Sequence, residues 1–180
     1  MAVDPFSARD AIGPIGWCPR RGPVTVQFTG LGARRRSVIS KAITDMFALA
    51  DLTCVKGPDV TYHPTSLGCP DAPLNRSVLV VALPDDDPLW QQWRADAWAA
   101  IPSMLTCPNG SEYNGGCIVI NPTTPLKYLR MIALHESGHL LGLGHRPGAG
   151  KSVMCTYPEV SEPSASDKKN ARILGGQCRD

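Results

Sequence analysis

The sequence predicts an α/β (α+β) domain, in which helices pack on a twisted mixed sheet of about 4–5 strands. Apolar and polar residues alternate from Val24 to Phe28, which is the period of a strand with one buried face. An apolar stripe then runs from about Arg34 to Ala50 at helical spacing, and it predicts a helix that backs the sheet. A third pattern, from Leu126 to Leu141, predicts a second helix entered through Pro125.

Further strands are expected between the first two helices. The segments that favour strands are Val60–His63, Val78–Leu83 and Cys117–Asn121. Of these, Val78–Leu83 is apolar throughout, which predicts a central strand. The Asn- and Gly-rich stretch between Cys107 and Cys117 predicts a loop, and residues 89–100 predict a short helix.

Length and charge restrict the classes of function. A chain of 180 residues fits one domain with a substantial core. The net charge of +2 is spread over scattered Lys and Arg residues, which argues against a nucleic-acid partner, and the triplet Arg34–Arg36 is interpreted as a solvated first helical turn. No segment has the 18 or more apolar residues of a membrane span. We expect a monomer whose domain covers residues 8–180, with residues 1–7 as a vector-derived leader.

The cysteines predict a secreted, extracellular protein. There are seven of them, none in a CxxC pair, and disulfides are their simplest use. Disulfides imply an oxidising compartment, and 17 Gly and 17 Pro residues agree with a loop-rich secreted domain. The predicted pairs are Cys54–Cys69, Cys107–Cys117 and Cys155–Cys178, which would leave Cys18 unpaired.

A candidate metal site lies at the end of the second predicted helix. His135 and His139 are four residues apart, so both imidazoles leave one helix face and suit two nitrogens about 2 Å from one zinc ion. Glu136 follows the first histidine. There its carboxylate can accept a proton from a zinc-bound water, so we expect Glu136 to be a general base.

A third ligand comes from the segment after the helix. His145 cannot reach the metal along a continuing helix, whereas Gly142 can adopt positive φ and turn the chain back beneath the ion. Three histidines and one open position predict a catalytic zinc ion rather than a closed structural site. His63 is interpreted as an ordinary residue, and Asp85–Asp87 lack the spacing of a calcium cage, so calcium is not expected to be essential.

The histidines, Glu136 and Gly142 together form a motif that resembles a known family. The motif HExxHxxGxxH from His135 to His145, followed by Met154, resembles that of the metzincin metalloproteases. The resemblance implies that Met154 lies under the histidines as an apolar floor; a generic core methionine is the alternative. Within that clan, Ser152–Met154 and the segment from Ser166 to Gly175 are most similar to the matrixins and their closing helix.

The resemblance implies a secreted zinc endopeptidase with a protein or peptide substrate. It divides the chain into an amino-terminal subdomain, about residues 8–142, and a carboxy-terminal one, about residues 143–180. Tyr157 and Pro158 would shape the pocket for the residue after the scissile bond, although a packing role fits equally well. An extended substrate would lie along the sheet edge near Cys117–Asn121 or the loop before it.

Two other functions stay open at this point. One is an inactive module that keeps the fold and binds a partner, which the intact Glu136 argues against. The other is a zinc hydrolase that acts on a different amide. Cys18 could also act as a reversible zinc ligand, as cysteines do in matrixin pro-segments, or form an ordinary or intermolecular disulfide.

Overall fold

The computed structural model describes residues 17, 21–61, 76–84, 86–88, 104–109 and 112–175. Within them, a five-stranded sheet has the strand order β2-β1-β3-β5-β4. Its strands are β1 (Val24–Thr29), β2 (Cys54–Lys56), β3 (Ser77–Ala82), β4 (Met104–Asn109) and β5 (Glu112–Ile120). The first four in spatial order run parallel, and β4 runs antiparallel to β5 at the edge.

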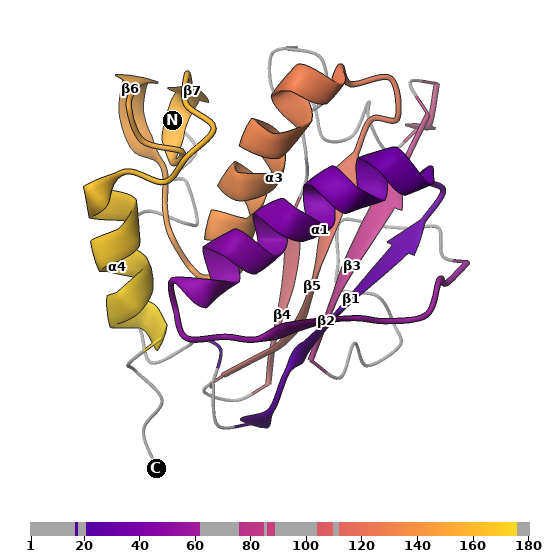
Figure 1. Ribbon diagram of the computed structural model, residues 1–180, viewed down its shortest axis with the longest axis horizontal. Helices are drawn as coiled ribbons and strands as arrows, with labels where there is room; N and C mark the ends of the chain where they lie inside the picture. The colour runs from indigo at the N-terminus through magenta and orange to yellow at the C-terminus, as the bar shows by residue number, and fades with distance from the viewer. Residues whose placement is uncertain are drawn as a thin grey trace.

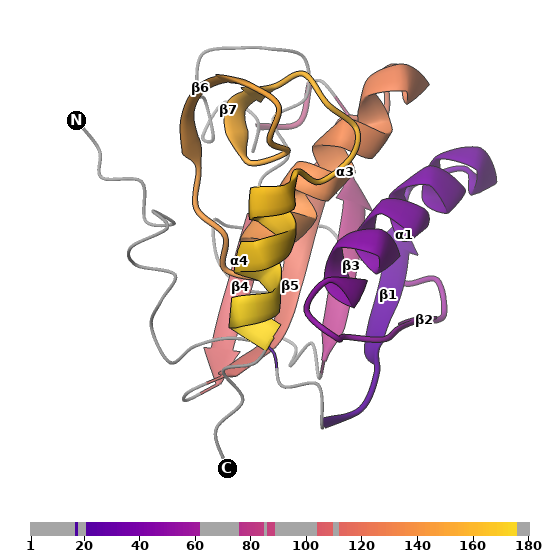
Figure 2. The same cartoon turned by 60° about the vertical axis from the view of Figure 1, so that its left-hand side comes forward.

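Three helices and a second, two-stranded sheet complete the described fold (Figure 1). They are α1 (Ala33–Ala48), α3 (Leu126–Leu140), α4 (Ala165–Gly175), β6 (Arg146–Gly150) and β7 (Cys155–Pro158). Figure 2 shows α1 and α3 on the same side of the large sheet, with α4 outside α3. This mixed sheet with three helices confirms the predicted fold class. None of the described helices has the length and apolar character that crossing a membrane requires.

The main core lies between the large sheet and the two long helices. On α1 the buried side chains recur at helical spacing, as its apolar stripe predicts, and they are Ile39, Ala42, Ile43, Met46 and Phe47. They pack with inward-facing residues of β1, β3 and β5 and with Leu129, Ala133 and Leu134 of α3. Strand β3 is buried at five of its six positions, which confirms that it is central.

Two anchors fix the ends of helices against this core. The indole nitrogen of Trp17 donates a hydrogen bond of 2.7 Å to the carbonyl oxygen of Leu140, which lies at the end of α3. At the end of α4, Gly175 meets the backbone of Ala50 so closely that any side chain there would overlap it. A glycine therefore lets α4 approach the chain just after α1.

The loop predicted between Cys107 and Cys117 is wrong, because this stretch forms most of an antiparallel strand pair. β4 and β5 pair with Leu105 opposite Cys117 and Cys107 opposite Gly115, and the register shifts at Pro108. The Asn and Gly residues of this stretch predicted a loop, and Pro108 does not prevent a strand there. An edge strand tolerates a proline because one side of its backbone needs no partner in the sheet.

The strand predicted at Val60–His63 does not form at the described residues of that segment, and a strand forms earlier, at β2. The described residues Val60 and Thr61 lie outside any strand, and β2 instead pairs with β1 through Val24↔Cys54. Gly57 ends this pairing against β1, where a side chain would overlap those of Thr25 and Gln27. His63 and the helix predicted over residues 89–100 lie outside the described residues.

The predicted disulfide pairs are also corrected. Cys54, Cys117 and Cys155 are free thiols, and each predicted pair contains one of them. The register places Leu105, not Cys107, opposite Cys117. Cys178, the partner predicted for Cys155, lies outside the described residues.

Candidate metal centre

The second half of α3 is enclosed on every side. All of its residues from Ala133 to Leu140 are buried, whereas Lys127 and Tyr128 in its first half are exposed. A helix that is buried all round has no solvated face for its polar residues. His135, Glu136 and His139 therefore project into the interior, where buried polar groups need specific partners.

The chain leaves α3 through a turn that Gly142 makes possible. Gly142 has φ of +94°, which confirms the predicted positive φ. Its backbone N–H donates to the carbonyl oxygen of His139 at 2.8 Å, and that of Leu143 donates to the carbonyl oxygen of Gly138 at 2.9 Å. These two bonds are the Schellman pattern, which satisfies the last carbonyls of a helix and reverses the chain.

The turn brings the third histidine to the other two. The Nε2 atom of His135 lies 3.1 Å from that of His139 and 3.0 Å from that of His145. The Nε2 atoms of His139 and His145 are 2.9 Å apart. A Zn–N bond is about 2.0–2.1 Å long, so two nitrogens bound to the same ion lie at most about twice that distance apart. All three separations are below that limit, and one ion can therefore contact the three nitrogens at once. The three histidines can therefore hold a metal ion.

Backbone carbonyls orient two of these rings. His135 donates from Nδ1 to the carbonyl oxygen of Val153 at 2.6 Å, and His139 donates from Nδ1 to that of Leu143 at 2.7 Å. A carbonyl only accepts, so the proton of each neutral ring is on Nδ1. Each Nε2 then presents its lone pair to the shared point, which is the arrangement of metal-binding histidines.

The electrostatics favour neutral rings. Burial, followed by the neighbouring His135 and His145, lowers the pKa of His139 to about 3, against the opposing effect of the bond to Leu143. Three imidazolium ions could not share this space because of their mutual repulsion. Neutral imidazole is the form that binds a metal.

Glu136 lies beside the cluster. The residue is 4% exposed, and its Oε1 atom is 3.6 Å from Nε2 of His135. Burial raises the pKa of the Glu136 carboxyl well above its usual value. A buried carboxyl with a perturbed pKa next to a ligand cluster has the properties of a general base or acid.

Met154 lies directly beneath this part of α3. It is 2% exposed, and a Cβ atom added at Gly138 would overlap its sulfur. Gly138 lies between His135 and His139 in sequence, so the methionine packs against the helix backbone between the two ligands. The backbone N–H of Arg146 donates to the carbonyl oxygen of Met154 at 2.7 Å, which ties this turn to the residue after His145.

Sequence reasoning missed the contribution of Asp167, which connects α4 to the methionine turn. Asp167 is 1% exposed and accepts hydrogen bonds from the Ser152 hydroxyl at 2.6 Å, the Val153 N–H at 3.1 Å and the Ser164 N–H at 2.8 Å. Ser164 Oγ in turn accepts from the Asp167 N–H, which makes a capping box at the start of α4. The spacing Ser-x-x-Asp before a helical run was the available signal, although it predicts only the cap.

The remaining predicted site residues lie on β7. Pro158 is half-buried and pairs with Gly150, and the backbone of Tyr157 pairs with Ala149. This small parallel sheet was not predicted. The role of Tyr157 and Pro158 in binding a substrate stays a prediction.

Comparisons with known proteins give little beyond the chain's own geometry. No family model matches the sequence, and no curated protein matches it. Among solved structures, the chain is similar to the structure of myroilysin, with a TM-score of 0.36 and 16% sequence identity over 80% of this chain and 49% of that one. The chain thus spans about half the length of that protein. Since the likeness is weak, the function has to be inferred from the residues of the site.

Proposed function

We propose that this chain is a secreted, metzincin-type zinc endopeptidase that hydrolyses peptide bonds. One observation carries the proposal: three imidazole nitrogens converge within 3.1 Å of one another, with the Glu136 carboxylate 3.6 Å from one of them. Three ligands supplied by the protein leave a fourth position for water or substrate, which distinguishes catalytic from structural zinc sites. An all-imidazole donor set suits zinc.

In this proposal His135, His139 and His145 hold the ion, and Glu136 moves the proton. A zinc ion bound there supplies a Lewis acid that polarises the scissile carbonyl and lowers the pKa of a bound water. Glu136 accepts the proton of the attacking water and passes it to the leaving amine nitrogen. Its burial keeps the carboxylate oriented and raises its pKa, which helps it to accept that proton.

The substrate would add to the sheet at β4. The strand order excludes the segment at Cys117–Asn121 as the edge, because Cys117–Ile120 lies in β5 between β3 and β4. β4 is the outer strand on this side of the described sheet, and an extended peptide can pair with such an edge through main-chain hydrogen bonds. The edge on the opposite side, β2, is separated from β5 by the two strands β1 and β3.

The test is a Glu136→Ala variant measured for both zinc content and casein cleavage. We expect bound zinc to stay near one ion per chain, because the three imidazoles are unchanged, while turnover falls by at least about a hundredfold, as for loss of a general base. Glu162→Gln is a matched control, since that side chain is 73% exposed and pairs only with Arg130 among the described ion pairs. Cleavage by Glu136→Ala at the unmodified rate would contradict the mechanism.

The same assay separates the alternatives. An inactive binding module would hold zinc without cleaving casein in either form, and a chelator would change nothing. A hydrolase of another amide would leave a peptide library intact while releasing product from its own substrate. Zinc-dependent cleavage within library peptides, away from their ends, is the outcome that supports an endopeptidase.

A further inference from the structure

The indole of Trp17 connects the first described residue of the chain to the end of the histidine helix. Trp17 is 2% exposed and belongs to the main core. Its ring meets that of Phe47 edge to face with centroids 5.5 Å apart, and the guanidinium carbon of Arg76 lies 5.7 Å from its centroid. Held in this way, Nε1–H donates to the carbonyl oxygen of Leu140 at 2.7 Å, across 123 positions of sequence.

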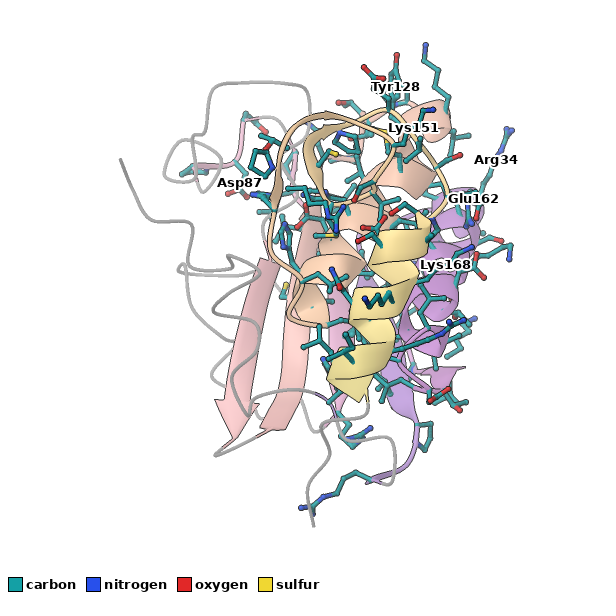
Figure 3. All side chains as sticks on the ribbon, turned by 90° about the vertical axis from the view of Figure 1, so that its left-hand side faces the viewer. Arg34, Asp87, Tyr128, Lys151, Glu162 and Lys168 are labelled. Atoms are coloured by element: carbon teal, nitrogen blue, oxygen red, sulfur yellow. The ribbon has the colours of Figure 1, made fainter. Side chains whose placement is uncertain are left out.

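The anchored end of α3 is the end at the metal centre. Figure 3 shows the exposed Tyr128 at the top of the view, where α3 begins, and the helix runs from there into the body of the molecule. The opposite end is fully buried at Leu140, which directly follows the candidate ligand His139. The bond from Trp17 therefore reaches the helix beside a metal-binding residue and not at its solvated start.

The carbonyl of Leu140 depends on this donor. An α-helix leaves its last four carbonyl groups without partners from the helix itself. In α3, those of Gly138 and His139 receive the N–H groups of the Schellman turn. No backbone N–H of the described residues donates to the carbonyl oxygen of Leu140, and this residue is fully buried. A buried carbonyl needs a partner, and Trp17 supplies it.

This bond fixes the peptide unit from which the turn starts. The peptide after Leu140 lies between His139 and Gly142, whose positive φ reverses the chain. A hydrogen bond is directional, so it sets the orientation of this peptide plane, which apolar packing does not. Residues 141–144 alone separate Leu140 from His145, and they include the Leu143 carbonyl that orients His139. A rotation of the peptide would therefore displace both ligands.

We infer that Trp17 is a positioning residue of the metal centre, whose indole N–H holds the Leu140 carbonyl and with it the turn that carries His145 to the other two histidines. The inference rests on the proposed function, because it assigns this role toward the zinc ion that the three histidines bind there. The ring and the N–H have separate effects. The ring fills the core against Phe47, whereas the N–H acts on the end of α3.

The experiment removes the N–H and keeps the ring. Benzothienylalanine, introduced site-specifically in place of Trp17, has a sulfur atom where the indole has its N–H and otherwise the same bicyclic shape. Trp17→Phe is the second variant. Phe47→Leu is the matched control, because it loosens the packing against the same indole and leaves the N–H in place. Urea unfolding gives the stability of every variant, so that the other readouts are compared at known stability.

We expect three changes in both Trp17 variants. In the metal-free chain, amide hydrogen exchange at Gly142 and Leu143 becomes about tenfold faster relative to that on α1, because their bonds to the helix end open locally. Zinc affinity in dye competition falls about threefold to tenfold, less than for a direct partner of a ligand, since Trp17 acts through the Leu140 carbonyl. The visible absorption of the Co²⁺-loaded chain, which depends on ligand geometry, shifts. Phe47→Leu lowers stability and leaves these three readouts unchanged.

Several outcomes would overturn the inference. Equal exchange at Gly142 and Leu143 with and without the indole N–H would do so, and so would faster exchange with unchanged zinc affinity and Co²⁺ spectrum. A loss of zinc affinity in Phe47→Leu as large as in the benzothienylalanine variant would reduce Trp17 to a packing residue. An unmodified chain that bound no zinc would contradict the proposed function, and the exchange measured without metal would still decide whether the N–H holds the turn.

Discussion

The two sides of the metal centre are held by different forces. On the amino-terminal side, α3 rests on α1 and the large sheet through apolar side chains such as Phe47, Ile118 and Leu129, all of them buried. On the carboxy-terminal side, the turn at Ser152–Cys155 is held by hydrogen bonds to the buried carboxylate of Asp167. Two ligands come from the first side, and the third comes from the chain that leads to the second.

This difference predicts different responses to mutation. Apolar packing is spread over many contacts, so the loss of one methyl group lowers the free energy of unfolding only slightly. It does not change the orientation of a metal ligand. A buried carboxylate with three donors concentrates its contribution in one residue, and its loss leaves several groups without partners. We therefore expect mutations on the carboxy-terminal side to change metal binding more than equal losses of stability on the amino-terminal side.

The largest effect is expected for Asp167→Asn. An amide has one accepting oxygen, so it cannot receive all of the donors from Ser152, Val153 and Ser164. The Val153 carbonyl that orients His135 would then shift. We expect the free energy of unfolding to fall by about 2–3 kcal/mol, as for lost hydrogen bonds to a charged group, and zinc affinity to fall about tenfold or more.

Urea unfolding and competition with a zinc-binding dye measure the two quantities. Glu162→Gln is again the control: its ion pair with Arg130 is at the surface, so its removal should cost about 0.5 kcal/mol or less and leave zinc affinity unchanged. If Asp167→Asn bound zinc as tightly as the unmodified chain, the proposed link from α4 to His135 would be wrong.

A smaller effect is expected for Gly138→Ala, which tests the contact between the helix and the methionine. Alanine in a helix interior is intrinsically better than glycine by about 1 kcal/mol, so propensity alone predicts a gain. The added Cβ would overlap Met154, and overpacking of this kind costs about 1–3 kcal/mol. We expect a net loss of stability in urea unfolding, together with weaker zinc binding.

The cause can be isolated with a double-mutant cycle. Met154→Ala removes the overlapping atoms at the cost of a cavity. In the Met154→Ala background, Gly138→Ala should therefore be neutral or stabilising. The same loss in both backgrounds would mean that Met154 is not what limits the size of residue 138.

The sequence predicted the amino-terminal side better, for a physical reason. Helix α1, strand β3 and the histidine helix carry a periodic apolar pattern, and periodicity follows from burial of one face. Gly142 was also predictable, because only a residue that tolerates positive φ can reverse the chain there. Both inferences need only local sequence and the geometry of one element.

The features that the sequence did not predict depend on contacts between segments that are distant in the chain. The stretch from Cys107 to Cys117 predicts a loop because its Asn and Gly residues have loop propensity, although the pairing of β4 with β5 overrides that propensity. Asp167 and Ser152 are 15 residues apart, and no local pattern indicates that a helix cap also holds a turn. The cysteine pairs failed similarly, since connectivity depends on the register of the whole sheet and not on spacing.

The smallest effect is expected for Ile43→Val on the amino-terminal side, and it completes the comparison. Ile43 is fully buried on α1 in the main core. Removing one methyl group there should lower the free energy of unfolding by about 0.5–1.5 kcal/mol. Zinc affinity should stay within about twofold, because the packing of α3 is shared among many side chains and no polar partner of a ligand is lost. Gly138→Ala lies on α3 but acts through its overlap with Met154, which belongs to the turn on the carboxy-terminal side. The pair Ile43→Val and Gly138→Ala would then have similar stabilities but different zinc affinities in the same dye competition. If Ile43→Val weakened zinc binding as much as Gly138→Ala did, metal binding would follow global stability, and the two sides would not differ in the way proposed.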